Sequence, residues 1–155
     1  MCGLNKFVDN FDFKSFLSNY DIIVLCETWS KFKGEFDNFL SCYVHFDFVR
    51  NMKINSIRNS EGVSVCIKSN LAKLNITRRL YDEYDNCVVL YFELSTLFTC
   101  EDIIMYLTYI SPEGSCYYDD KEQKNGILSM QSNLECIFND HPNTSLFIAG
   151  DLNSR

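Results

Sequence analysis

Several residue types that mark particular classes of protein are scarce in this sequence. Its 155 residues include six glycines, two prolines, one tryptophan and two histidines. So few glycines and prolines, beside 46% hydrophobic residues, exclude a disordered or fibrous chain. The longest apolar runs, such as Ile22–Cys26, are far shorter than the ~20 residues of a membrane-spanning helix. The first residues also lack a charged segment leading into an apolar stretch. We therefore expect one folded module with neither a membrane span nor a secretion signal.

No Cys-x-x-Cys pair occurs among the eight cysteines. The cysteines are scattered, and His45 and His141 lie far from any such pair, which argues against structural zinc. Cys26 and Cys66 fall inside apolar, strand-like runs, where a free thiol behaves as a small hydrophobic group. These features favour reduced cysteines and an intracellular protein, in the nucleus or the cytoplasm.

Positive charge is also scarce, since 14 basic residues face 21 acidic ones and the net charge is −7. Binding to phosphates is driven by Lys and Arg, so this balance argues against a nucleic-acid partner. The distribution weakens that argument, because Arg50–Arg79 holds seven basic residues and only one acid, Glu61. The acids gather instead at Asp82–Asp85 and Glu113–Glu122. Two solvated faces of opposite sign explain this pattern equally well, so charge leaves nucleic-acid binding open.

Hydrophobic spacing predicts a mixed α/β or α+β chain that forms one module. The aromatic residues of Phe11–Asn19 have near-helical spacing, with Asp9 or Asn10 as the N-cap. The run Asp21–Glu27 is typical of a strand buried on both faces. Alternation and length predict the remaining elements, which are strands Tyr43–Val49, Gly62–Lys68, Cys87–Ser95, Ile103–Ile110 and Ser145–Ala149 and an amphipathic helix over about 120–139. Helices are expected to cover the sheet faces.

Two predicted strands deliver a carboxylate at their carboxyl ends, Glu27 after IIVLC and Asp151 after LFIAG. A third strand, MYLTY, ends on Tyr109. If these strands lie side by side, the three side chains converge where α/β folds place ligands. Mg²⁺ takes one or two carboxylates plus phosphate oxygens, an Asp can activate water, and Tyr109 and Asn153 can donate to a phosphate. Spacing alone leaves open that the acids cap strands and that Tyr109 is a core residue.

Four segments, in order, resemble motifs of the endonuclease/exonuclease/phosphatase superfamily. Cys26-Glu27-Thr28-Trp29 resembles its ETW motif, and Gly62–Val65 resembles its GGVAV strand, with Glu61 where a first glycine is usual. Thr108–Ser115 looks like the Y-x-x-P segment, in the PEGS form seen in retrotransposon endonucleases. Ala149–Arg155 is similar to GDLNAR, the most specific motif of the set. The chain therefore resembles the endonucleases of non-LTR retrotransposons, which accompany a reverse transcriptase.

The resemblance implies a fold, an activity and four site residues. The fold would be part of a DNase-like, four-layer α/β/β/α sandwich, and the activity Mg²⁺-dependent phosphodiester hydrolysis that nicks DNA. Glu27 would bind Mg²⁺, which Mn²⁺ can replace, and Tyr109 would contact the scissile phosphate. Asp151 would position the nucleophilic water, and Asn153 would hold the phosphate.

The same resemblance predicts that residues 1–155 form only part of the domain. The family's first-strand Asn would precede Cys2–Leu4, and its Ser-Asp-His segment would follow Arg155; Asn5, His45 and His141 are no substitutes. The missing C-terminal half is therefore an expected partner, and this chain alone is expected to be inactive or nearly so. We also expect it to supply roughly one sheet, with an exposed apolar face that includes Val88, Leu90, Phe92 and Leu94.

Two alternatives stay open. The chain could belong to another branch of the superfamily, such as the phosphoinositide phosphatases or the sphingomyelinases. Those phosphatases often have a Trp just before the Gly-Asp, whereas Ile148-Ala149 precede Gly150 here, which favours the nuclease branch. Alternatively, the chain could be a decayed, non-catalytic copy or an interaction module.

Overall fold

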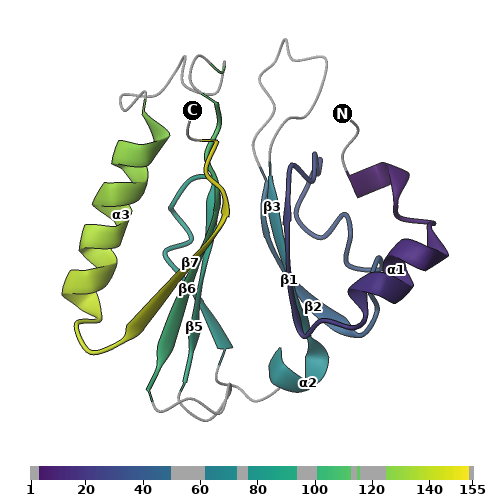
Figure 1. The fold of residues 1–155 in the computed structure, drawn as a ribbon, viewed down its shortest axis with the longest axis horizontal. Coiled ribbons are helices and arrows are strands. Elements are labelled where there is room, and N and C mark those ends of the chain that lie inside the picture. Colours follow the sequence, from purple (N-terminus) through teal and green to yellow (C-terminus); the bar gives the residue numbers. More distant parts are fainter. Residues whose placement is uncertain are drawn as a thin grey trace.

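The computed structural model describes residues 4–49, 62–72, 77–93, 101–112, 115 and 125–153. Two β-sheets lie face to face, with α3 outside one sheet and α1 outside the other (Figure 1). The elements are η1 (Leu4–Lys6), α1 (Phe11–Leu17), β1 (Ile22–Cys26), β2 (Tyr43–Phe48), β3 (Val63–Lys68), α2 (Ser69–Ala72), β4 (Thr77–Leu80), β5 (Cys87–Phe92), β6 (Ile103–Tyr109), α3 (Gly126–Asp140) and β7 (Ser145–Asp151). This arrangement confirms the predicted α/β/β/α class.

Both longer helices begin where the sequence offers an asparagine cap. The side chain of Asn10 accepts a hydrogen bond from the Phe13 amide (2.9 Å), so Asn10, and not Asp9, caps α1. Asn125 accepts from the amides of Ile127 and Leu128 at the start of α3. The part of the predicted second helix at residues 120–124 lies outside the described residues. Within the described part of the chain, no helix is long and apolar enough to cross a membrane.

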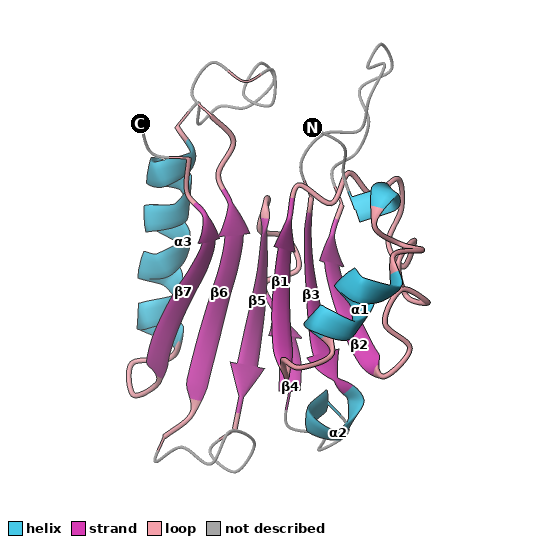
Figure 2. Ribbon diagram, turned by 45° about the vertical axis from the view of Figure 1, so that its right-hand side comes forward, coloured by secondary structure: helices cyan, strands magenta, loops and turns pink. Residues whose placement is uncertain are grey.

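Sheet 1 has the strand order β1-β3-β2, with antiparallel pairs throughout. Sheet 2 has the order β4-β5-β6-β7, in which only β6 and β7 are parallel. Figure 2 shows the strands of both sheets, with α3 beside β7 and α1 over the sheet that contains β1 and β3. The sequence pattern did not predict β4 or α2, because TRRL and SNLA are too short and too polar to show a period.

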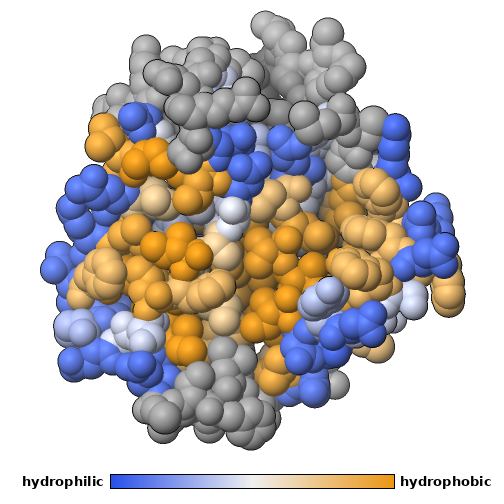
Figure 3. All heavy atoms as spheres, viewed as in Figure 1, coloured by the Kyte–Doolittle hydropathy of each residue, from blue (hydrophilic) through white to orange (hydrophobic). Residues whose placement is uncertain are grey.

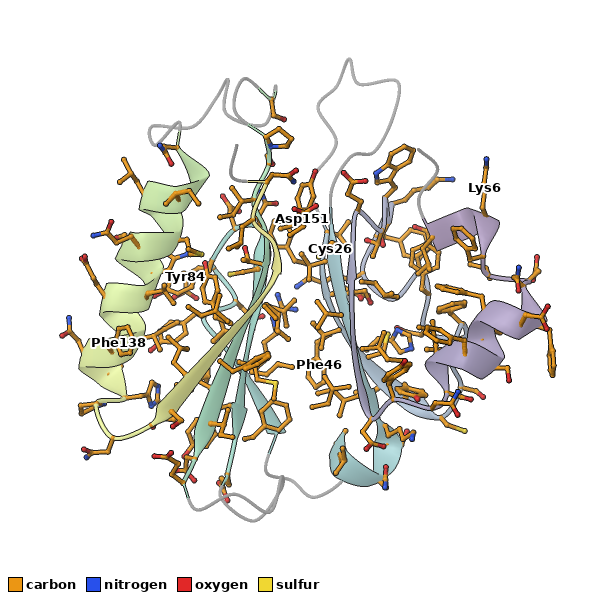
Figure 4. All side chains as sticks on the ribbon, viewed as in Figure 1. Lys6, Cys26, Phe46, Tyr84, Phe138 and Asp151 are labelled. Atoms are coloured by element: carbon orange, nitrogen blue, oxygen red, sulfur yellow. The ribbon has the colours of Figure 1, made fainter. Side chains whose placement is uncertain are left out.

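The main core lies between the two sheets. Val63, Val65 and Ile67 of β3 pack against Val88, Leu90, Phe92 and Leu107 of sheet 2, and each of these is at most 1% exposed. Phe46 also points into this space (Figure 4). The prediction of one sheet with an exposed apolar face is therefore wrong, because the chain supplies two sheets whose apolar faces cover each other. Leu94 lies outside the described residues.

Each outer face has a core of its own beneath a helix. Under α1, Leu17, Ile23, Phe39 and Cys66 belong to one buried cluster. Under α3, Ile137 packs on sheet 2 with Ile104 and Tyr106, and Met130 and Leu134 lie against them. The predicted apolar stripe of α3 is only partly buried, since Ile127 and Phe138 remain exposed.

One side of the sandwich is open. β1 and β7 are the edge strands of their sheets and lie against each other across the sandwich. On β7, Phe147 is 53% and Ile148 41% exposed. Apolar residues gather across the centre of this side (Figure 3). As predicted, β1 packs on both faces, with Ile23 under α1 and Val24 in the core between the sheets, but as an edge strand it is mostly half-buried.

The cysteines agree with the sequence interpretation where they are described. Cys26, Cys42, Cys66, Cys87 and Cys136 are free thiols. Cys66 is fully buried on the outer face of sheet 1, so it packs as a small apolar group.

Candidate functional site

Glu27 and Tyr109 meet across the sandwich. Tyr109 is the last residue of β6 and is 3% exposed, while Glu27 directly follows β1 and is half-buried. The Tyr109 hydroxyl donates a hydrogen bond to Glu27 Oε1 at 2.9 Å. The aromatic ring packs in the core between the sheets, and its hydroxyl reaches the rim. Tyr109 therefore serves both as a core residue and as a partner of the carboxylate.

Asp151 lies beside Tyr109 at the end of β7. The parallel register of β6 and β7 aligns Tyr109 with Asp151, and the Ile110 amide donates to the Asp151 carbonyl (2.8 Å). The Asp151 side chain is exposed, and its Oδ1 accepts from the Asn153 amide (3.0 Å). Asn153 Nδ2 in turn donates to the Ile110 carbonyl (3.0 Å). This turn holds Asp151 and Asn153 next to the Tyr109 strand end.

Cys26 lies at the same end of the sandwich as the two carboxylates. Its sulfur lies 3.8 Å from the Thr108 carbonyl oxygen, which belongs to the opposite sheet. Burial is the main cause that raises the pKa of the Cys26 thiol. The Asp151 backbone amide opposes this by hydrogen bonding to the sulfur, and the charges of Asp151 and Glu27 raise the pKa further. Both acids therefore act on one thiol, and Figure 4 shows Cys26 and Asp151 side by side.

Gly150 allows Asp151 to reach this position. Its φ is +137°, and a Cβ atom built on it would lie 1.7 Å from the Thr108 carbonyl oxygen. Any side chain there would collide with the β6 backbone, so only glycine fits. Gly150 is thus a local requirement of the β6–β7 contact.

The donors at this rim fit Mg²⁺ better than zinc. Within the described residues, no group of three or more His, Cys, Asp and Glu side chains could hold a metal ion. Mg²⁺ keeps several waters and needs only one or two protein carboxylates beside substrate phosphates. Glu27 supplies one such carboxylate, and Asp151 lies at the same strand-end rim, beside Tyr109.

The four site residues predicted from the sequence lie together, but not as strand ends of a single sheet. Glu27 comes from sheet 1, whereas Tyr109, Asp151 and Asn153 come from or follow sheet 2. The expected convergence assumed that the three strands lie side by side; β6 and β7 do, whereas β1 faces them across the sandwich. The approach of Cys26 to Thr108 in the opposite sheet left no signal in the sequence.

Other candidates lie elsewhere or outside the described residues. His45 Nδ1 lies 3.5 Å from Cys66 Sγ, and the His141 ring contacts Tyr81 and Tyr91, so neither histidine reaches the rim. Two of the basic residues in the 50–79 segment form ion pairs within the chain, Lys68 with Asp21 and Arg79 with Asp82. The other basic side chains of that segment, and Glu113, Gly114, Ser154 and Arg155, lie outside what the structure describes.

Comparison with known proteins relates the chain through its fold. No protein-family model matches the sequence, and no curated protein does either. Among solved structures, the chain is similar to TDP2 from Caenorhabditis elegans, with a TM-score of 0.55 and 13% sequence identity. A second structure, of selenomethionine TDP2 from the same organism, gives a TM-score of 0.51 at the same identity. The first match covers 98% of this chain but only 44% of TDP2, so the chain spans less than half of that protein. The shared fold is DNase-like.

Proposed function

We propose that the chain is part of a Mg²⁺-dependent phosphodiesterase that nicks DNA, of the type carried by non-LTR retrotransposons. The observation that carries the proposal is the hydrogen bond from Tyr109 to Glu27, with Asp151 aligned beside Tyr109. Three motifs that are far apart in the sequence thus supply one rim. The DNase-like fold and the similarity to TDP2 support the reaction class, and the PEGS and GDLN segments support the retrotransposon type.

Each residue has a role that follows from its surroundings. Glu27, held by Tyr109, would bind Mg²⁺ or Mn²⁺, and the metal would neutralise charge on the phosphate. Asp151 is exposed and can accept a proton from, or orient, a water molecule. The Asn153 side-chain amide can donate its second hydrogen to a phosphate oxygen as the charge of that oxygen grows, and the Tyr109 hydroxyl would contact the phosphate in place of its hydrogen bond to Glu27.

We further propose that residues 1–155 are an incomplete domain whose C-terminal half contributes further charged groups. The open side at β1 and β7 and the coverage of only 44% of TDP2 support this proposal. On this view the chain alone has little or no activity, and its DNA-facing basic groups lie partly in the missing half. The proposed compartment remains the nucleus or the cytoplasm, where DNA is available and thiols stay reduced.

The test is nicking of supercoiled plasmid by the chain alone and by the chain joined to the polypeptide encoded directly downstream. We expect the joined protein to nick with Mg²⁺ and not with EDTA. Glu27→Gln should lower the rate by about a hundredfold or more, because it removes the metal-binding charge. Glu135→Gln, the same change on the exposed face of α3, should leave the rate unchanged. Nicking by Glu27→Gln at the unmodified rate would refute the proposal.

A non-catalytic role is the second candidate, and the open apolar edge favours it. If the chain is a decayed copy or an interaction module, Mg²⁺ should not stabilise it against heat. A rise in melting temperature with Mg²⁺ that Glu27→Gln abolishes would exclude this candidate. A lipid-phosphate substrate, as in the phosphoinositide or sphingomyelin branch, would appear as release of phosphate or phosphocholine without plasmid nicking.

A further inference from the structure

The segment that carries Glu27 has an unusual backbone. Glu27 and Trp29 both have positive φ, 54° and 56°, although neither is glycine. Side-chain-bearing residues adopt this left-handed region at a cost, so it persists only where surrounding contacts determine it. The residue between them, Thr28, makes such contacts.

Thr28 is 1% exposed and uses its backbone and its side chain at once. Its amide donates to the Gly62 carbonyl (3.4 Å), and its carbonyl accepts from the Leu4 amide (3.2 Å). Its hydroxyl oxygen accepts from the Ser30 hydroxyl (3.0 Å). Thr28 therefore ties its own turn, which presents Glu27, to η1 and to the start of β3.

Gly62 makes room for this side chain at the start of β3. A Cβ atom at Gly62 would lie 2.6 Å from Thr28 Oγ1 and 3.4 Å from the Phe48 carbonyl oxygen. The φ of Gly62 is +99°, which also disfavours a side chain. The Thr28 hydroxyl thus occupies space that a larger residue at position 62 would fill.

We infer that Thr28 is a positioning residue. Its buried side chain fixes the two left-handed residues on either side, so that the Glu27 carboxylate meets the Tyr109 hydroxyl. The geometric part of this inference stands on the contacts alone, while its importance for hydrolysis rests on the proposed function. The hydroxyl is the essential group, because it accepts from Ser30 in the space that Gly62 leaves open.

The test follows the Tyr109 hydroxyl directly, by NMR of the full chain labelled with ¹³C at the tyrosine ring Cζ. The Tyr109 signal is assigned by its loss in Tyr109→Phe. Glu27→Gln should shift this signal, because the carboxylate acceptor is lost. Thr28→Val keeps the shape but not the hydroxyl and should shift the signal in the same direction, whereas Thr28→Ser should leave it near the original position.

Ser64→Ala is the matched control, because Ser64 is also 1% exposed and its hydroxyl donates to Asp47 (2.6 Å) on the outer side of sheet 1. It should lower stability without moving the Tyr109 signal. An unmoved Tyr109 signal in Thr28→Val, or an equal shift in Ser64→Ala, would overturn the inference. If Thr28→Val does not fold, Ser30→Ala replaces it, since it removes the donor to Thr28; an unmoved signal there has the same meaning.

Added Mn²⁺ separates this inference from the proposed function. Mn²⁺ at Glu27 should broaden the Tyr109 signal of the unmodified chain, and Thr28→Val should need at least about threefold more Mn²⁺ for the same broadening. If Mn²⁺ broadens nothing while the shifts behave as expected, the metal-dependent function fails and the positioning role of Thr28 stands.

Discussion

Glu27 and Asp151 are both acids at strand ends, but their surroundings are opposite. Glu27 is half-buried and accepts a hydrogen bond from a core tyrosine, and a buried threonine anchors its turn. Asp151 is exposed on an edge strand, and a two-residue turn to Asn153 holds it. A fixed carboxylate suits a metal ligand, whereas an acid open to water suits activation of a nucleophile. The surroundings of the two acids therefore fit the proposed roles, Glu27 as metal ligand and Asp151 as the residue that positions water.

Gly150→Ala should have the largest effect on stability, because it places a side chain where the backbone of β7 lies close to that of β6, next to Asp151. The new Cβ would overlap the Thr108 carbonyl oxygen, and the backbone would also have to leave φ +137°. We expect a loss of about 3 kcal/mol or more in the free energy of unfolding, measured by urea denaturation. Gly126→Ala, at the start of α3, is the control and should cost nothing. A nearly unchanged Gly150→Ala would show that β6 and β7 do not approach as described.

Truncating a side chain in the core between the sheets should cost more stability than truncating one on the open edge at β7. Leu90→Ala removes a side chain that is 0% exposed between the sheets and should cost about 3 kcal/mol. Phe147→Ala removes a side chain that is 53% exposed on β7 and should cost less than about 1 kcal/mol. Equal losses in urea denaturation would mean that the edge is covered, for example by association of chains.

The strand faces and the rim of the candidate site could be predicted from the sequence, but the packing between the sheets could not. Alternation in β3 and β5 shows which residues share a face, and the strand-end acids mark a rim. Alternation does not show which face meets which, so the packing of β3 against β5 across the sandwich was missed. Thr28 was missed too, because its importance depends on the space beside Gly62, which belongs to a distant segment.

Tyr109→Phe tests the Glu27 end alone. It removes a hydrogen bond to a carboxylate in a partly buried place and should cost about 1.5 kcal/mol or more. Tyr81→Phe is the matched control, since the Tyr81 hydroxyl donates to Asp140 (2.7 Å) at an exposed site and should cost about 0.5 kcal/mol. If Tyr81→Phe costs as much as Tyr109→Phe, the Glu27 end is no more fixed than the surface.

The smallest expected effect is a loss of stability at high pH, caused by the buried thiols of Cys66 and Cys87. Burial raises the pKa of Cys66 from 9.0 to about 12, and that of Cys87 equally. Above pH 9 the unfolded thiols lose protons that the folded ones keep, so stability is present below pH 9 and falls toward pH 12. Urea denaturation at pH 8 and pH 10 should show a loss of about 1 kcal/mol per thiol. Cys66→Ala and Cys87→Ala should each reduce the loss of stability between pH 8 and pH 10, and an unchanged loss in both variants would contradict the burial of these thiols.

The most direct test of the central claim is the position of a bound metal. Crystals of the chain soaked in Mn²⁺ should show an anomalous peak within about 2.2 Å of a Glu27 carboxylate oxygen, on the side facing Asp151. Glu27→Gln crystals treated in the same way should lack it. A peak only at other acids, or the same peak in Glu27→Gln, would contradict the assignment of this rim as a metal-dependent phosphodiesterase site.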